Sequence, residues 1–422
     1  MPKFILFLLL LISIPFLANA LDLVEPEVAG FIPNRLDWID SMIQECINQN
    51  EVPGAVAILI KNGQIGYFKS FGFADIDSQK PMGKTSMFRI ASMSKLITTV
   101  AALQLYERGH YHMETPLGSI LPEFDQPEVF ISWDEDKQTF QTEPARKKIR
   151  MKHLFTHTSG IIYPIFTDKG RSGYMKAKIT DAFPDGSIDL AENIRRLASV
   201  PLAHQPGDGY TYGMNMDVLG RVVEVIDGRP FARYMREEIF QPLGMIDTGF
   251  SIPEDKQDRI VSVYTTRNGK MKPFDEQVMA EQASNNFKEW WKLDADKIAL
   301  GGAGIISTTY DYALFLQMLV NKGQLNGKRI LGRKTVELIS RGVYSQGSES
   351  TTAIGLSVSV VVNEKGHYQP DSVGTFVGGG YFYTSFWVDP KEQMIGVLMS
   401  QINPSNSQVG GNFKIMAYAA LE

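Results

Sequence analysis

The sequence contains one cysteine, Cys46, among its 422 residues. A single thiol cannot form an internal disulfide, so a disulfide-stabilised fold is excluded. It also excludes a structural zinc site that needs two or four thiolates. Cys46 falls in a stretch whose apolar residues, Leu36, Ile39, Ile43 and Ile47, keep helical spacing. We therefore expect Cys46 to be a core residue of a helix and not a nucleophile.

A surplus of positive charge is also missing. The chain has 42 Lys and Arg against 47 Asp and Glu, which gives a formal net charge of −5 at pH 7. Binding to the phosphate backbone of nucleic acids depends on a basic surplus, so we expect no nucleic-acid partner. The composition, with 44% hydrophobic and 21% charged residues, is that of a folded globular protein.

The long apolar stretch at the start of the chain has the pattern of a signal peptide. Lys3 is followed by the mainly apolar residues 4–17 and by the small-residue sequence Ala18-Asn19-Ala20. The stretch is shorter than the ~20 residues that span a bilayer, and Pro15 interrupts it. We expect cleavage after Ala20, a periplasmic or secreted protein, and no stable membrane anchor in the mature chain.

Strand patterns lie at both ends of the chain and helical patterns lie between them. Asn62-Gly63 separates two apolar runs, 55–60 and 64–71, which predicts a β-hairpin. Further strand-like runs cover 353–362, 382–388 and 394–400. The Thr308-x-x-Asp311 sequence predicts a capped helix start.

These patterns predict a two-lobed fold of the α/β (α+β) class. We expect residues 21–422 to form one domain, because no repeat or long linker divides them. Residues 21–110 and 291–422 would form an antiparallel sheet from the N- and C-terminal strands, flanked by helices, and residues 111–290 a mainly helical lobe. A cleft between two such lobes is where a substrate is expected.

Two common hydrolase signatures are absent. No G-x-S-x-G sequence occurs, which argues against an α/β-hydrolase. His153 and His157 have the spacing of a zinc pair, but Leu154 stands where a zinc protease has its glutamate. We expect neither a metal ion nor an organic cofactor.

Ser92-Met93-Ser94-Lys95 is an S-x-x-K sequence at the start of a helical pattern. Its position would put the Ser92 hydroxyl at a helix N-terminus, where backbone N–H groups favour negative charge. Lys95, one turn later, faces the same side. A serine hydroxyl needs a base, which could be a neutral Lys95 or a tyrosine whose pKa a charged Lys95 lowers. Tyr212, on a predicted loop after Pro206-Gly207, is a candidate.

Several segments in order resemble the serine β-lactamase and penicillin-binding-protein-like hydrolases, in particular the class C-like branch that includes the family VIII carboxylesterases. The resemblance runs from about Leu36 to Gln401. It rests on the sequences at 88–92, 154–160, 242–250, 301–304 and 386–390.

The resemblance implies a set of site residues. Ser92 would be the nucleophile, Lys95 its activator, and Tyr212 the tyrosine of the Y-x-N element, with Tyr210 as a competing candidate. The third element of the family would fall at Gly378-Gly379-Gly380, and the oxyanion hole would combine the backbone N–H groups of Ser92 and Tyr381.

Two departures from the family pattern bear on the substrate. Met214 stands where Y-x-N has its asparagine, and Asn215 follows it. Gly378 stands where penicillin-recognising members have a lysine that holds the substrate carboxylate. Loss of a charge-assisted contact worth about 1.5–3 kcal/mol favours neutral esters over carboxylated substrates.

We therefore expect an exported serine hydrolase, a carboxylesterase that cleaves small neutral esters through an acyl-enzyme on Ser92. One alternative is a β-lactamase or D-amino-acid peptidase on the same scaffold, acting on an amide. Another is a binding protein that keeps the fold without catalysis.

Overall fold

The computed structural model describes residues 21–167, 171–267, 270–274, 289–345, 347 and 350–422. The predicted signal peptide, residues 1–20, lies outside this range. Among the helices that are described, none has both the length and the apolar character that crossing a membrane requires.

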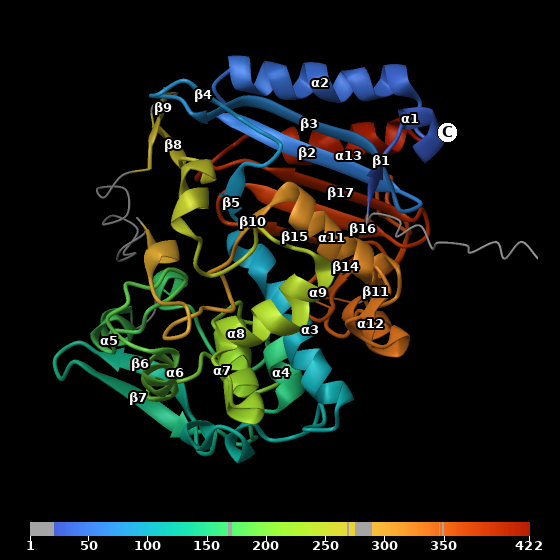
Figure 1. Cartoon of the computed structure of the whole chain (residues 1–422). Helices are drawn as coiled ribbons and strands as arrows, with labels where there is room; N and C mark the ends of the chain where they lie inside the picture. The colour runs from blue at the N-terminus through green and yellow to red at the C-terminus, as the bar shows by residue number, and fades with distance from the viewer. Residues whose placement is uncertain (1–20, 168–170, 268–269, 275–288, 346, 348–349) are drawn as a thin grey trace, which may run out of the picture.

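The two ends of the chain meet in one mixed sheet (Figure 1). Its strand order in the described residues is β1-β3-β2-β17-β16-β15-β14-β13, with β4 paired to β3. The N-terminal strand β2 runs antiparallel to the C-terminal strand β17, where Ile58 lies opposite Val397. The predicted hairpin is present, since Lys61 pairs with Gln64 across Asn62-Gly63. The strands are β1 (Asp22–Leu23), β2 (Gly54–Lys61), β3 (Gln64–Asp75), β4 (Lys80–Pro81), β13 (Thr352–Ile354), β14 (Ser359–Val361), β15 (Phe376–Gly380), β16 (Thr384–Asp389) and β17 (Met394–Met399).

Helices cover both faces of this sheet. Successive residues of a strand point to opposite faces, so β2 contributes to two hydrophobic clusters. Ala55, Ala57 and Leu59 pack with α2 (Pro33–Asn48) and α13 (Val409–Ala419) on one face. Val56, Ile58 and Ile60 belong to the larger cluster on the other face, which includes α3 (Ser94–Glu107) and α11 (Thr309–Val320). Cys46 is a buried free thiol of α2, as predicted.

The middle of the chain forms the second, mainly helical lobe, in the lower part of Figure 1. It also carries a β-hairpin. Its elements are β6 (Glu128–Asp134), β7 (Thr139–Pro144), α4 (Met151–Phe155), α5 (Arg171–Lys176), α6 (Leu190–Ala198), α7 (Asn215–Asp227), α8 (Phe231–Met235), η5 (Arg236–Phe240) and α9 (Gln241–Leu243). The remaining described elements include α1 (Pro26–Ala29), β5 (Met87–Arg89), η1 (Ala91–Met93), β8 (Tyr264–Arg267), β9 (Lys270–Pro273), β10 (Ile306–Thr308), β11 (Gln324–Leu325), β12 (Lys328–Arg329) and α12 (Arg333–Ile339).

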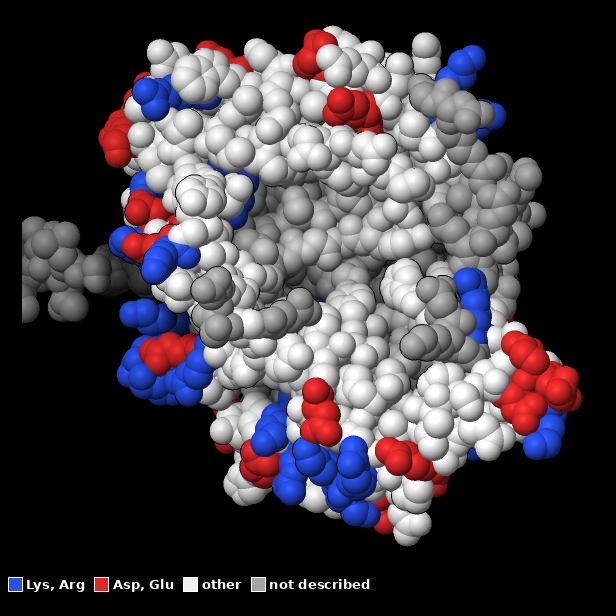
Figure 2. All heavy atoms as spheres, turned by 180° about the vertical axis from the view of Figure 1, so that it is seen from behind, with Lys and Arg blue, Asp and Glu red and all other residues white. Residues whose placement is uncertain are grey.

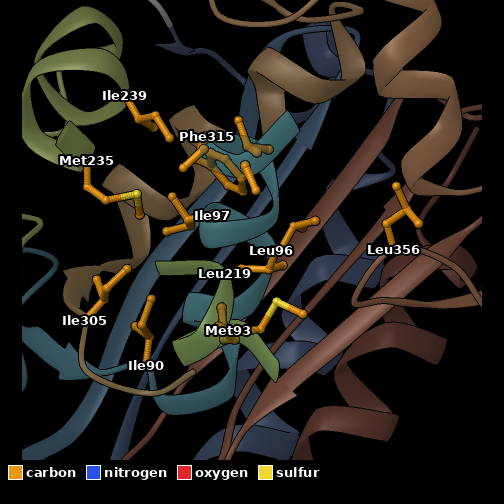
Figure 3. Close-up of a cluster of buried hydrophobic side chains, with 14 of the residues drawn as sticks. Ile90, Met93, Leu96, Ile97, Leu219, Met235, Ile239, Ile305, Phe315 and Leu356 are labelled. Carbon is orange, nitrogen blue, oxygen red and sulfur yellow. The ribbon is translucent and has the colours of Figure 1, made fainter. Parts of the chain in front are cut away.

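Helix α3 joins the two lobes through its side chains. Figure 3 shows Ile97 of α3, Leu219 of α7 and Phe315 of α11 in one buried cluster. All three side chains are fully buried. Residues of α3 are buried on every side over most of its length, because the helix runs between the sheet and the helical lobe. Its first turn therefore lies where the lobes meet.

Local patterns located the elements well but missed some of their ends. Thr308 does cap α11, since its side chain accepts a hydrogen bond from the N–H of Asp311. The predicted strand 353–362 is instead two short strands, β13 and β14, because Ser357 adopts a φ of 63° that an extended strand does not allow. Likewise β16 starts at Thr384 and not at Phe382, since Tyr383 has a φ of 67° and donates its N–H to Gly380.

Replacement of Gly396 by alanine should destabilise the sheet. Gly396 of β17 lies opposite Trp387 of β16, and a Cβ at Gly396 would come within 2.1 Å of the buried indole ring. Overpacking of this kind costs about 1–3 kcal/mol. We expect Gly396→Ala to lower the free energy of unfolding in urea by that amount. Gly411→Ala, in the exposed part of α13, is the matched control and should leave the free energy of unfolding unchanged or raise it. Equal effects of the two variants would contradict the close packing of Gly396 against Trp387.

Candidate active site

Ser92 lies in the tight turn η1, between β5 and the start of α3. Helix α3 itself begins at Ser94, two residues later than the sequence pattern indicated. Ala91, directly before Ser92, has a φ of 43°, in the left-handed region that residues with a side chain rarely adopt. Such strained residues cluster at functional sites. The turn leaves the Ser92 side chain partly exposed while Ala91 and Met93 are buried.

Two side chains donate hydrogen bonds to the Ser92 hydroxyl. The Nζ of Lys95 lies 3.0 Å from Ser92 Oγ, and the hydroxyl of Tyr212 lies 2.7 Å from the same atom. Lys95 is only 2% exposed, and its Nζ lies 4.7 Å from the centre of the Tyr212 ring. The structure thus brings together the three residues that the sequence predicts as catalytic.

A buried peptide group and a buried carboxylate hold Lys95 in place. Lys95 Nζ donates a second hydrogen bond, of 2.7 Å, to the carbonyl of Gly302. The N–H of Gly302 in turn donates to Oδ1 of Asp217, at 3.0 Å. Burial raises the pKa of Asp217 to about 6, and the hydrogen bond from Gly302 and the charge of Lys95 oppose that rise. A Cβ at Gly302 would lie 2.5 Å from the Tyr163 hydroxyl and 2.7 Å from Asp217 Oδ2, so a side chain here would displace these groups.

The imidazole of His157 supports Tyr212 from behind. The two rings are stacked with their centres 4.8 Å apart. The N–H of Gly213 and the side-chain amide of Asn215 both donate to Nδ1 of His157, so the neutral ring carries its proton on Nε2. Ser159 donates to the amide oxygen of Asn215 and fixes that side chain. Burial, with the charge of Lys95, lowers the pKa of His157 to about 3.

Ser92 opens into a small apolar pocket of about 140 Å³. None of the described residues that line it is charged, and aromatic rings form much of its wall. Phe183, on this wall, stacks on Trp290 with ring centres 4.8 Å apart. Figure 2 shows a hollow in the middle of one face whose visible surface is largely uncharged, with acidic and basic residues toward the edges. The lining residues of the pocket are Ala91, Ser92, Tyr163, Ile165, Phe166, Ala182, Phe183, Tyr212, Phe274, Ala303 and Tyr381.

The other residues predicted from the sequence differ in how close they lie to Ser92. Gly380 packs against the backbone of Ile90, where a Cβ would come within 2.3 Å of the carbonyl oxygen, and Tyr381 lines the pocket. Gly378 and Gly379 lie further back on β15 and do not line the pocket that the described residues form. Asn215 is fully buried behind His157.

Tyr210, the competing candidate for Tyr212, lies apart from the nucleophile. Its ring stacks on Tyr344, with ring centres 6.0 Å apart, and lies at a similar distance edge-on to His157. Tyr212 is the tyrosine whose hydroxyl contacts Ser92.

Four residues of this site were not identified as such from the sequence: Tyr163, His157, Asp217 and Gly302. The segments 154–160 and 301–304 contributed to the resemblance, and their glycines and histidine were the available signal. Asp217 and Gly302 are 85 positions apart, and no local pattern links them.

Comparisons with known proteins find matches over most of the chain. The family model described as Beta-lactamase matches residues 39–421. Esterase EstB of Burkholderia gladioli is 30% identical over 361 residues, which cover 83% of this chain and 86% of that protein. Protein Rv1367c of Mycobacterium tuberculosis is 29% identical over 386 residues, 88% of this chain and 92% of the relative.

Solved structures share the fold. EstCE1, described as a hydrolase with promiscuous acyltransferase activity, superposes with a TM-score of 0.77 at 24% identity, over 92% of this chain and 98% of its own. A class C beta-lactamase superposes with a TM-score of 0.66 at 16% identity, over 92% of this chain and 97% of its own.

The buried His157 should make the protein sensitive to acid. Histidine in an unfolded chain titrates near 6.5, so between about pH 6.5 and 3 the unfolded state binds more protons and stability falls as the pH falls. Between pH 7 and pH 5, we expect the free energy of unfolding of wild type to fall by on the order of 2 kcal/mol more than that of His157→Asn. Asparagine is the chosen replacement because it tolerates the φ of 54° at this position.

Urea unfolding at pH 7, 6 and 5 measures this difference. The exposed His110→Asn variant is the control and should follow wild type at each pH. A stability gap between wild type and His157→Asn that stays constant with pH would show that His157 is not held neutral.

Proposed function

Because this chain belongs to the Beta-lactamase family and is a serine hydrolase, we propose that it is an exported carboxylesterase that cleaves small neutral esters through an acyl-enzyme on Ser92. One observation carries the proposal: Ser92 Oγ accepts hydrogen bonds from both Lys95 Nζ and the Tyr212 hydroxyl. Either neighbour, once it has lost a proton, can accept the proton of Ser92 and later return it to the leaving group.

Acylation begins with attack of Ser92 Oγ on the ester carbonyl. The serine proton passes to the Lys95–Tyr212 pair, either to a neutral Lys95 amine or to a Tyr212 phenolate that the Lys95 charge stabilises. Collapse of the tetrahedral intermediate breaks the ester C–O bond, and the same pair returns the proton to the leaving alcohol. Asp217, through Gly302, keeps Lys95 within reach of Ser92 during these transfers.

Deacylation follows the same route in reverse. A water molecule gives its proton to the Lys95–Tyr212 pair and attacks the acyl carbonyl; Ser92 leaves with the proton and the carboxylic acid is released. An alcohol in place of the water would give acyl transfer by the same steps.

The backbone at Ser92 and Tyr381 supplies the oxyanion hole in this proposal. The close packing of Gly380 on Ile90 brings the end of β15 next to the Ser92 turn, so that the two N–H groups can converge on the carbonyl oxygen. One such donor contributes about 10²–10³ in rate in serine hydrolases.

The pocket and Gly378 favour neutral esters over penicillins and D-peptides. The described pocket walls offer no cation for a substrate carboxylate. A side chain at Gly378 would meet the Phe386 ring, since even a Cβ would lie 2.6 Å from it, so the lysine of penicillin-recognising members cannot replace it without displacing that ring. The name of the relative Esterase EstB agrees with this preference.

Export is the second part of the proposal and rests on the signal-peptide pattern of residues 1–20. N-terminal sequencing of the protein from the native cell envelope or medium should find Leu21 as the first residue. A chain that begins at Met1 and fractionates with the cytoplasm would overturn this part and leave the esterase proposal standing.

Loss of the nucleophile should abolish ester hydrolysis. We expect Ser92→Ala to reduce turnover of p-nitrophenyl acetate to background, and Lys95→Met to lower kcat about 10²–10⁴-fold with little change in KM, because the amine acts mainly in the transition state. Steady-state kinetics with circular dichroism as the folding control measure both effects. Full activity of Ser92→Ala would refute the mechanism, and nitrocefin turnover equal to ester turnover would favour the β-lactamase alternative.

The size of the pocket should limit the acyl chain. The pocket has a volume of only about 140 Å³, and aromatic rings form much of its described wall. We expect kcat/KM for p-nitrophenyl esters to peak between acetate and pentanoate and to fall for octanoate. Ile165→Ala, which widens the pocket wall, should shift the peak to longer chains. A profile that keeps rising to decanoate in wild type would place the acyl group elsewhere.

A further inference from the structure

A second cavity lies away from Ser92. It is a groove of about 830 Å³ on the helical lobe, formed by the segment that leads into α4, the turn at Pro206-Gly207 and the residues around the end of α12. It shares no lining residue with the apolar pocket at Ser92. The proposed esterase reaction therefore leaves this groove without a role.

Positive charge dominates the groove. Six cationic side chains line it, and no Asp or Glu is among the described lining residues. Three carboxylates outside the groove pair with four of these cations. Glu114 binds Arg150 and Lys152, Asp208 binds Lys147, and Asp125 binds Lys148. In the described part of the chain no carboxylate forms an ion pair with the remaining two, Arg146 and Arg341.

The groove belongs to the lobe that holds α4, in the lower part of Figure 1. Figure 2 shows Lys and Arg side chains at this end of the molecule, with Asp and Glu side chains among them. Six cations with three carboxylates leave a local surplus of positive charge on a chain whose net charge is −5. A concave surface with one sign of charge concentrates ions of the opposite sign.

A buried neutral donor faces the same groove. His153 is 8% exposed, and its Nδ1 accepts the N–H of Arg150 at 3.2 Å. The proton of the neutral ring is therefore on Nε2, next to the bare backbone of Gly207, where a Cβ would lie 3.3 Å away. Burial, with the charges of Lys152 and Arg150, lowers the pKa of His153 to about 4, so at neutral pH it is a donor without charge.

Apolar side chains line the same groove. They include Leu338, Val343, Tyr344 and Leu356, and Val343 is 52% exposed. Stacking on Tyr210 holds the Tyr344 ring. A ligand that matches both kinds of lining residue combines an anionic group with an alkyl or aryl body.

We propose that this groove is a binding site for a small amphipathic anion, with a carboxylate or similar group held by Arg146, Arg341 and the Nε2–H of His153, and an apolar body against Leu338, Val343 and Tyr344. Guanidinium groups bind carboxylates through paired, charge-assisted hydrogen bonds. The site is separate from the esterase chemistry and does not depend on Ser92 being a nucleophile.

Calorimetric titration of the mature protein with octanoate tests the site. Octanol, which lacks the charge, and inorganic phosphate, which lacks the apolar body, are the two partial probes. We expect octanoate to bind at least about tenfold more tightly than either, and its affinity to fall when the NaCl concentration is raised to 0.5 M. If octanol bound as tightly as octanoate, the site would be purely apolar. If phosphate bound as tightly as octanoate, the site would bind any anion. Either result would overturn the proposal.

A matched pair of variants locates the binding. Val343→Glu puts a carboxylate into the groove at an exposed position, and Val343→Gln is the neutral variant of similar size. We expect Val343→Glu to weaken octanoate binding about tenfold and Val343→Gln to leave it within about twofold. Equal affinities of the two variants would place octanoate elsewhere, for example in the pocket at Ser92.

Removal of Arg146 and Arg341 provides an independent test. Arg146→Ala with Arg341→Ala should weaken octanoate binding about tenfold, whereas the control double variant Arg195→Ala with Arg236→Ala, at exposed positions outside the groove, should not. Equal loss in both double variants would show a general charge effect and contradict a specific site.

Discussion

The buried amine of Lys95 is the constraint on which the arrangement of the site depends. A charged or polar group can be buried only if its hydrogen bonds are satisfied. Lys95 is 2% exposed, and the carbonyl of Gly302 and the hydroxyl of Ser92 accept hydrogen bonds from its Nζ. These partners come from different parts of the chain, so the lysine is stable only when α3, the segment before β10 and the Ser92 turn are all assembled. The two-lobed fold is what assembles them.

The helical lobe supplies Tyr212 and Asp217 from the start of α7 and the loop before it. Tyr212 reaches Ser92 from this loop, and Asp217 in the first turns of α7 binds the peptide that holds Lys95. His157 stacks behind Tyr212 and bonds the backbone that follows it. A shift of α7 relative to α3 would therefore move both Tyr212 and Asp217, which supports Lys95. The closely packed hydrophobic core between the lobes holds the two helices in place (Figure 3).

The sequence predicted what local chemistry determines. The S-x-x-K spacing placed Ser92 and Lys95 on one side of a helix start, and Asn62-Gly63 marked a hairpin that pairs as expected. What it could not predict depends on contacts between distant residues. Asp217 meets Gly302 only through folding, and the break in the strand near Ser357 reflects a backbone angle that strand propensity does not reveal. The basic groove is of the same kind, because its cations come from segments nearly two hundred residues apart.

Intact-mass spectrometry after treatment with a fluorophosphonate probe is the most direct test of an activated Ser92. The mature protein should gain one adduct, peptide mapping should place it on Ser92, and Ser92→Ala should gain none. An adduct on another residue would contradict the assignment of the nucleophile. A folded protein that gains no adduct would contradict a nucleophilic serine and favour a binding protein that keeps this fold.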